Sequence, residues 1–133
     1  LLQSRELDDV VMISAYTGDL VIIPPGYGHI SINPSPDTPL TMANIVSTAF
    51  ESEYGQYENY HGGAYYEMSD GRMQKNPRYP HLPPIRYIGS TCGNGVHPLC
   101  RGPLYNLIGN DDALSFLNNP EKFLPVFSVL LKD

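Results

Sequence analysis

The chain has 133 residues, a length that predicts a single domain. Its 8 Lys and Arg against 14 Asp and Glu give a net charge of −6, which argues against a nucleic-acid-binding surface because such surfaces need a cationic patch. No apolar run reaches the roughly 18–20 residues that span a bilayer, so no membrane contact is expected. Since no signal-peptide pattern is seen either, a cytoplasmic location is the expectation.

Charged residues make up 17% of the chain, whereas Gly, Pro and Tyr number 12, 13 and 10, and this composition favours short strands joined by turns. Runs of apolar and β-branched residues predict strands at 1–3, 10–14, 20–23, 29–33, 40–50, 63–68, 72–74 and 85–88. Asp70-Gly71 predicts a hairpin turn. In segment 29–33 polar and apolar residues alternate, which places His29 on the face opposite Ile30 and Ile32.

The last third of the chain predicts short helices. Acidic residues in the first turn and Asn110 as N-cap predict a helix at 111–117. Pro120 suits the first turn of a second short helix, over 120–123. The chain therefore divides into residues 1–88, a part of a β-barrel, and residues 89–133, a loop and short-helix extension.

One pattern around the predicted turn at 24–26 points to a site inside that barrel. The sequence fits G-x5-P-x-G-x2-H-x3-N with Gly18, Pro24, Gly26, His29 and Asn33. The glycines permit tight turns, and a histidine at the start of a strand can aim a ring nitrogen inward with little entropy left to lose, which suits a metal ion. The alternative is a histidine satisfied by a hydrogen bond inside an ordinary β-sandwich.

The pattern resembles the second conserved motif of the cupin superfamily, and further segments resemble cupin-type glucose-6-phosphate isomerases, in particular their longer bacterial branch. The segments that carry this resemblance, in chain order, are Leu1-Leu2-Gln3, Met12-Ile13-Ser14, Tyr54-Gly55, His61-Gly62-Gly63-Ala64-Tyr65-Tyr66, Asn76-Pro77-Arg78-Tyr79 and Leu117–Phe123. The resemblance implies an all-β cupin double-stranded β-helix, or jelly-roll barrel, with a short helical tail. It also implies a homodimer that interconverts glucose 6-phosphate and fructose 6-phosphate.

The resemblance implies a divalent metal, Fe²⁺, Mn²⁺, Zn²⁺ or Ni²⁺, with His29 as one ligand. The family's other ligands come from an earlier H-x-H motif with a downstream Glu, and this sequence lacks that motif. Because one imidazole cannot hold a divalent ion tightly, the chain is expected to be the C-terminal portion of a longer enzyme and to be inactive alone.

Two further residues are candidates for contact with the sugar phosphate. Tyr54 matches the family's Tyr-Gly pair and is expected to position a sugar hydroxyl. His61 is a candidate second imidazole from a different loop, with a surface or hydrogen-bonded histidine as the alternative. The sequence departs from the archaeal form at Val46 and Ser52, which stand where that form has a Tyr and a His near the substrate.

Other readings of the chain stay open at this stage. A non-catalytic cupin sugar-binding module, or another metal-dependent cupin enzyme such as an oxygenase, would share the same motif. Cys92 and Cys100, with His97 between them, lack the C-x2-C spacing of structural zinc sites and are expected to be reduced thiols.

Overall fold

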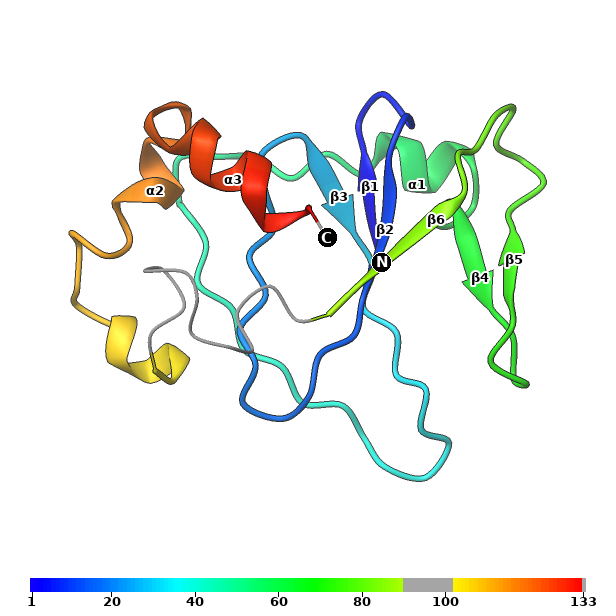
Figure 1. The fold of residues 1–133 in the computed structure, drawn as a ribbon, viewed down its shortest axis with the longest axis horizontal. Helices are drawn as coiled ribbons and strands as arrows, with labels where there is room; N and C mark the ends of the chain where they lie inside the picture. The colour runs from blue at the N-terminus through cyan, green and yellow to red at the C-terminus, as the bar shows by residue number, and fades with distance from the viewer. Residues whose placement is uncertain (90–101, 133) are drawn as a thin grey trace.

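Two small sheets and a C-terminal group of short helices make up residues 1–89 and 102–132, the part of the chain that the computed structural model describes (Figure 1). The strands are β1 Leu2–Ser4, β2 Val10–Ile13, β3 Tyr27–His29, β4 Tyr65–Glu67, β5 Met73–Lys75 and β6 Ile85–Ile88. The helices are α1 Gly55–Asn59, α2 Ser115–Asn118 and α3 Leu124–Leu130, with 3-10 turns η2 Leu104–Leu107 and η3 Pro120–Phe123. The expected β-rich fold with a helical tail is confirmed at this level.

The larger sheet has the order β3-β1-β2-β6. Strand β1 lies between β2 and β3 and is antiparallel to both, and β2 pairs in parallel with β6. Leu2 pairs with Val11 on one side and with His29 on the other. Because side chains alternate along a strand, the sheet has two apolar faces, and both are covered.

Each face of the larger sheet packs on a different part of the chain. Leu2 and Val11 contact Leu131, at the end of α3. Val10, on the opposite face, belongs to a cluster with Ala64 and Tyr65 of the β4 region. The C-terminal tail and the β4–β5 hairpin therefore cover the same sheet from opposite sides, as Figure 1 shows.

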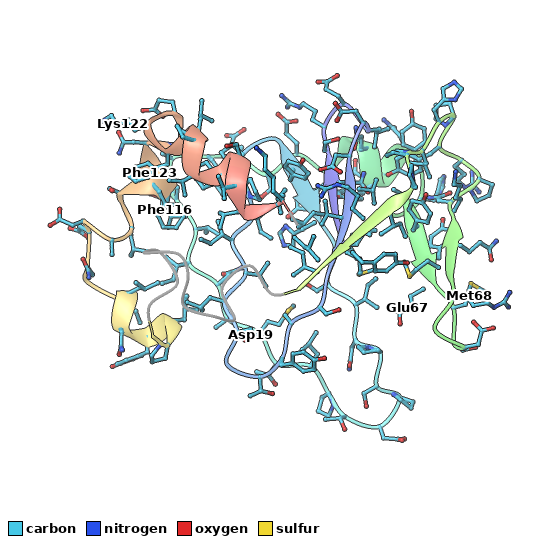
Figure 2. All side chains as sticks on the ribbon, viewed as in Figure 1. Asp19, Glu67, Met68, Phe116, Lys122 and Phe123 are labelled. Carbon is cyan, nitrogen blue, oxygen red and sulfur yellow. The ribbon has the colours of Figure 1, made fainter. Side chains whose placement is uncertain are left out.

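The predicted hairpin around Asp70-Gly71 is confirmed. Strands β4 and β5 pair antiparallel, and the Gly71 N–H donates to the Met68 carbonyl at 2.8 Å. Gly71 has φ of 80°, a left-handed value that only glycine adopts without strain. The tip of this hairpin, next to Met68, extends away from the larger sheet (Figure 2).

Two predicted strands are wrong. Residues 20–23 form no strand, and Ile22 packs instead against Phe116, Phe127 and Leu130 of the tail. Residues 40–50 are irregular and largely exposed. The reason is the same for both segments: an apolar, β-branched run becomes a strand only when a neighbouring strand takes up its backbone hydrogen bonds, and none in the described residues does so.

The tail departs from the prediction in detail. Residues 111–114 form turns, and the α-helix begins only at Ser115 with Leu114 as its N-cap. The Asn110 side chain accepts the Ala113 N–H at 3.1 Å and so stabilises the preceding turn instead of the helix. Helix α3 was not predicted. Phe116 packs edge-on against Phe123, with ring centroids 6.3 Å apart (Figure 2). In the described residues no helix has both the length and the apolar character needed to cross a membrane.

Candidate functional site

His29 is the last residue of β3, an edge strand of the larger sheet. Its side chain is exposed. The backbone around it is fixed by the pairing with Leu2 and by the Ile30 N–H, which donates to the Leu1 carbonyl at 2.8 Å. The predicted strand at 29–33 is wrong beyond its first residue, because β3 ends at His29 and residues 30–33 are irregular. The burial still alternates, since Ile30 and Ile32 are half-buried while Ser31 is exposed.

The turns that lead into β3 have the conformations that the motif predicts. Gly18 and Gly26 have φ of 91° and 79°, in the left-handed region. The Gly26 carbonyl accepts the Arg5 N–H at 2.8 Å, which ties the turn to the end of β1. Asn33 organises the loop after β3, because its amide donates to the Thr38 carbonyl at 2.8 Å. The motif therefore builds a rigid entry to the strand that carries His29.

Tyr54 and His61 lie at the two ends of α1. Tyr54 precedes the helix, and 62% of its surface is exposed. His61 follows the helix with φ of 53°, an unusual value for a residue with a side chain, and its side chain is exposed too. No hydrogen bond joins the side chains of His29, Tyr54 and His61 within residues 1–89 and 102–132.

Helix α1 nevertheless docks directly on the strand that carries His29. The ring of Tyr57 lies against Gly28, where an added Cβ would come within 3.0 Å of the ring carbon Cζ and closer still to the hydroxyl oxygen. Farther along, Gly63 leaves room for the side chain of Ile30. The docking of α1 on β3 is therefore made by close approach at two glycines, which the sequence motif did not single out as contact points.

The hydroxyl of Tyr57 is buried at this contact. Within the described residues it has no hydrogen-bond partner. Burial raises the pKa of Tyr57 to about 12, with a smaller contribution from Tyr79. A buried hydroxyl without a partner destabilises the fold, so its position results from the packing of its ring on Gly28.

Replacement of Gly28 with alanine is expected to destabilise the protein by about 1–3 kcal/mol, because the new methyl group would overlap the Tyr57 ring. Chemical denaturation measures the change. Gly55→Ala is the matched control, since nothing lies within 4 Å of that position, and it should leave the stability nearly unchanged. Tyr57→Phe should be neutral or stabilising and should reduce the effect of Gly28→Ala. An equal effect of Gly28→Ala in both backgrounds would contradict this contact.

A network of buried polar side chains lies beneath α1. Gln3 and Asn76 are each 1% exposed. The Gln3 amide nitrogen donates to Gln56 Oε1 at 3.0 Å and to the Tyr79 hydroxyl at 3.1 Å, and its oxygen accepts the Ala64 N–H at 2.9 Å. Every polar atom of this side chain is thus satisfied, as burial requires.

Asn76 completes the network at the start of the Asn-Pro-Arg-Tyr segment. Its amide nitrogen donates to the Tyr60 and Gly63 carbonyls at 2.9 and 3.0 Å, and its oxygen accepts the Arg78 N–H at 3.0 Å. The Tyr79 hydroxyl donates to the Gly62 carbonyl at 2.9 Å. The side chains of Asn76 and Tyr79 therefore hold the loop that follows α1, including the backbone on either side of His61.

A second polar cluster lies on the face covered by the C-terminal tail. The Arg86 guanidinium donates to both carboxylate oxygens of Asp9 at 2.8 Å and to the Leu131 carbonyl at 2.8 Å. Tyr27 donates to the same carboxylate at 2.7 Å. The hydrogen bond from Arg86 lowers the pKa of Asp9, and burial, then Asp9, raise the pKa of Tyr27 to about 12. This cluster fastens α3 to the sheet.

The described residues do not fit a complete metal site. No group of three or more His, Cys, Asp or Glu side chains that could hold a metal occurs in residues 1–89 and 102–132. His29 offers one nitrogen, whereas divalent ions in proteins usually have at least three protein ligands. Cys92, His97 and Cys100 lie outside the described residues.

Sequence reasoning missed Gln3, Tyr57 and the Asp9–Arg86 pair as organisers of this region. Two features of the sequence point to part of this region. Gln3 is a polar residue that follows two apolar ones in a predicted strand, and the Asn76-Pro77-Arg78-Tyr79 segment was noted for its resemblance without a structural role. No local sequence pattern indicates that Arg86 pairs with Asp9, because the two residues lie 77 positions apart in the sequence.

A comparison with protein-family models finds one described as Glucose-6-phosphate isomerase (GPI), which matches residues 1–83. The matched region contains β1 to β5 and all three of His29, Tyr54 and His61. The chain has no significant match among curated proteins or among solved structures. Since the match covers more than half of the 133 residues, the chain belongs to the glucose-6-phosphate isomerase family.

Proposed function

We propose that this chain contributes to the active site of an aldose–ketose isomerase that interconverts glucose 6-phosphate and fructose 6-phosphate. The observation that carries the proposal is the family match over residues 1–83, which includes the turn motif before β3. The short strands and covered sheet are compatible with part of a cupin double-stranded β-helix, which is the barrel we propose for the complete enzyme. The sugar phosphate is the proposed ligand, and a homodimer is the proposed assembly.

His29 is the proposed metal ligand of this part of the enzyme. Its backbone is held by β1 and its imidazole is exposed, so the ring is accessible to a metal whose other ligands come from outside the described residues. We propose that an H-x-H motif and a Glu earlier in the complete enzyme supply those ligands. Bound there, a divalent ion would supply a Lewis acid.

Tyr54 and His61 are the proposed substrate contacts. Both side chains are exposed at the ends of α1, and α1 packs on Gly28, the residue before His29. Tyr54 would donate a hydrogen bond to a sugar hydroxyl. His61 would act as a hydrogen-bonding or proton-transferring imidazole.

The test is an isomerase assay on the full open reading frame and on the 133-residue chain. Fructose 6-phosphate is supplied with Fe²⁺, Mn²⁺, Zn²⁺ or Ni²⁺, and formation of glucose 6-phosphate is followed. The expected result is activity of the full-length protein that chelation removes and metal restores, and no activity of the 133-residue chain alone until it is co-expressed with the upstream segment. A full-length protein that binds the sugar phosphate without turnover would instead indicate a binding module.

A further inference from the structure

A groove of about 490 Å³ lies beside the loop that joins β5 to β6, away from His29 and Tyr54. Its walls include Lys75, Pro77, Pro80, His81, Leu82 and Pro83. Its volume falls in the range of small-molecule sites, roughly 300–1,000 Å³. We propose that this groove binds a small organic anion that has one charged group and an apolar body.

The groove is lined mainly by a stretch of the chain that has no acidic side chains. Residues 71–110 contain no Asp or Glu, although the whole chain has a net charge of −6. Lys75 has no carboxylate within ion-pair distance in the described residues, and its ammonium donates only to the Leu82 carbonyl at 3.3 Å across the groove. Leu7 lines the groove, but its neighbours Glu6 and Asp8 do not line it. The groove therefore presents an ammonium and the His81 imidazole without a compensating carboxylate.

Hydrogen bonds and proline residues hold the groove in a fixed shape. Asn76 and Tyr79 anchor its floor through the hydrogen bonds described above, and the Tyr79 ring lies tilted by 37° against Tyr60 with centroids 4.2 Å apart. The prolines at 77, 80 and 83 fix φ at three positions of the loop. A pre-formed groove binds without first losing conformational entropy, so a small ligand can bind with few contacts.

The lining also selects the body of the ligand. The polar atoms of the Asn76 and Tyr79 side chains are engaged in the core, so Lys75 and His81 are the lining side chains that can reach a ligand with a polar group. The remaining walls are proline rings and leucine. The proline rings and leucine side chains offer a flat apolar ring contacts that a polyhydroxylated body would use less well.

The test uses the uniformly ¹⁵N-labelled full chain titrated with phenyl phosphate and followed by amide shifts. Shifts are expected at residues 75–82, with Lys75→Gln/His81→Gln weakening the apparent affinity about tenfold or more, because the Lys75 ammonium and the His81 ring are both lost. Lys122→Gln is the matched control, since that ammonium also donates to one oxygen at 3.3 Å, on the opposite side of the molecule (Figure 2). It should change the affinity less than twofold.

Two further probes complete the test. Inorganic phosphate and glucose 6-phosphate should each bind this groove at least about fivefold more weakly than phenyl phosphate, because neither offers an apolar ring. Equal affinity for either probe, shifts that fall outside residues 75–82, or unchanged affinity in the double variant would overturn the proposal. The binding is measured without turnover, so an inactive enzyme would refute the proposed isomerase function and leave this result unaffected.

Discussion

Replacement of His29 with alanine in the proposed complete enzyme is expected to lower the metal content and to reduce isomerase activity by on the order of 100-fold or more, because loss of one proposed ligand would severely weaken a divalent site. The fold should survive, since the His29 side chain is exposed and its backbone pairing with Leu2 does not depend on it. Metal analysis of the purified variant and the fructose 6-phosphate assay measure the two effects.

Two other variants help to distinguish a metal-ligating role of His29 from a purely structural one. Ser31→Ala changes an exposed residue two positions further along the same face and should alter neither metal content nor activity. Tyr54→Phe should keep the metal and reduce turnover, because it removes one hydroxyl at an exposed position. Full metal content and activity in the His29 variant would show that this histidine is not a ligand.

Replacement of Asn76 with alanine is expected to lower the free energy of unfolding by roughly 2–4 kcal/mol. The variant would leave the Tyr60 and Gly63 carbonyls and the Arg78 N–H without this partner, and the bond to Gly63 is fully buried. Urea denaturation followed by tyrosine fluorescence or circular dichroism measures the change.

Asn33→Ala is the matched control for this prediction. The Asn33 side chain also makes hydrogen bonds to the backbone, but it is exposed, so water can replace it. Its loss should cost less than about 1 kcal/mol. If the two variants were equally destabilised, burial of the Asn76 network would not be the cause of its contribution.

Elements with local signals could be predicted from the sequence. The β4–β5 hairpin follows from the Asp70-Gly71 turn between two predicted strands, and the turns at Gly18 and Gly26 follow from the residue types that tolerate positive φ. The strand at 85–88 was predicted from its residues, whereas its parallel pairing with β2 was not. Such pairing depends on residues far away in the chain, which composition and spacing do not reveal.

The site, like the fold, has features that local sequence predicts and features that depend on distant residues. The motif predicted the rigid turn before His29, whereas the ring, expected to point inward, is exposed in the described residues. The docking of α1 could not be predicted, because it depends on the absence of a side chain at Gly28 meeting a ring from Tyr57. Nor could the Gln3 network, whose three partners come from three separate segments.

The parallel pairing of β2 with β6 has a consequence for how the chain folds. The Asp9–Arg86 ion pair, beside this strand pair, joins residues 77 positions apart, so the loop that must close before they meet contains most of the matched family region. Closing so long a loop loses entropy before the new contacts compensate for it, and topologies of this kind fold slowly. Strand β2 therefore stays an open edge during folding until β6 arrives, and in that interval it is the segment most prone to pair with another chain.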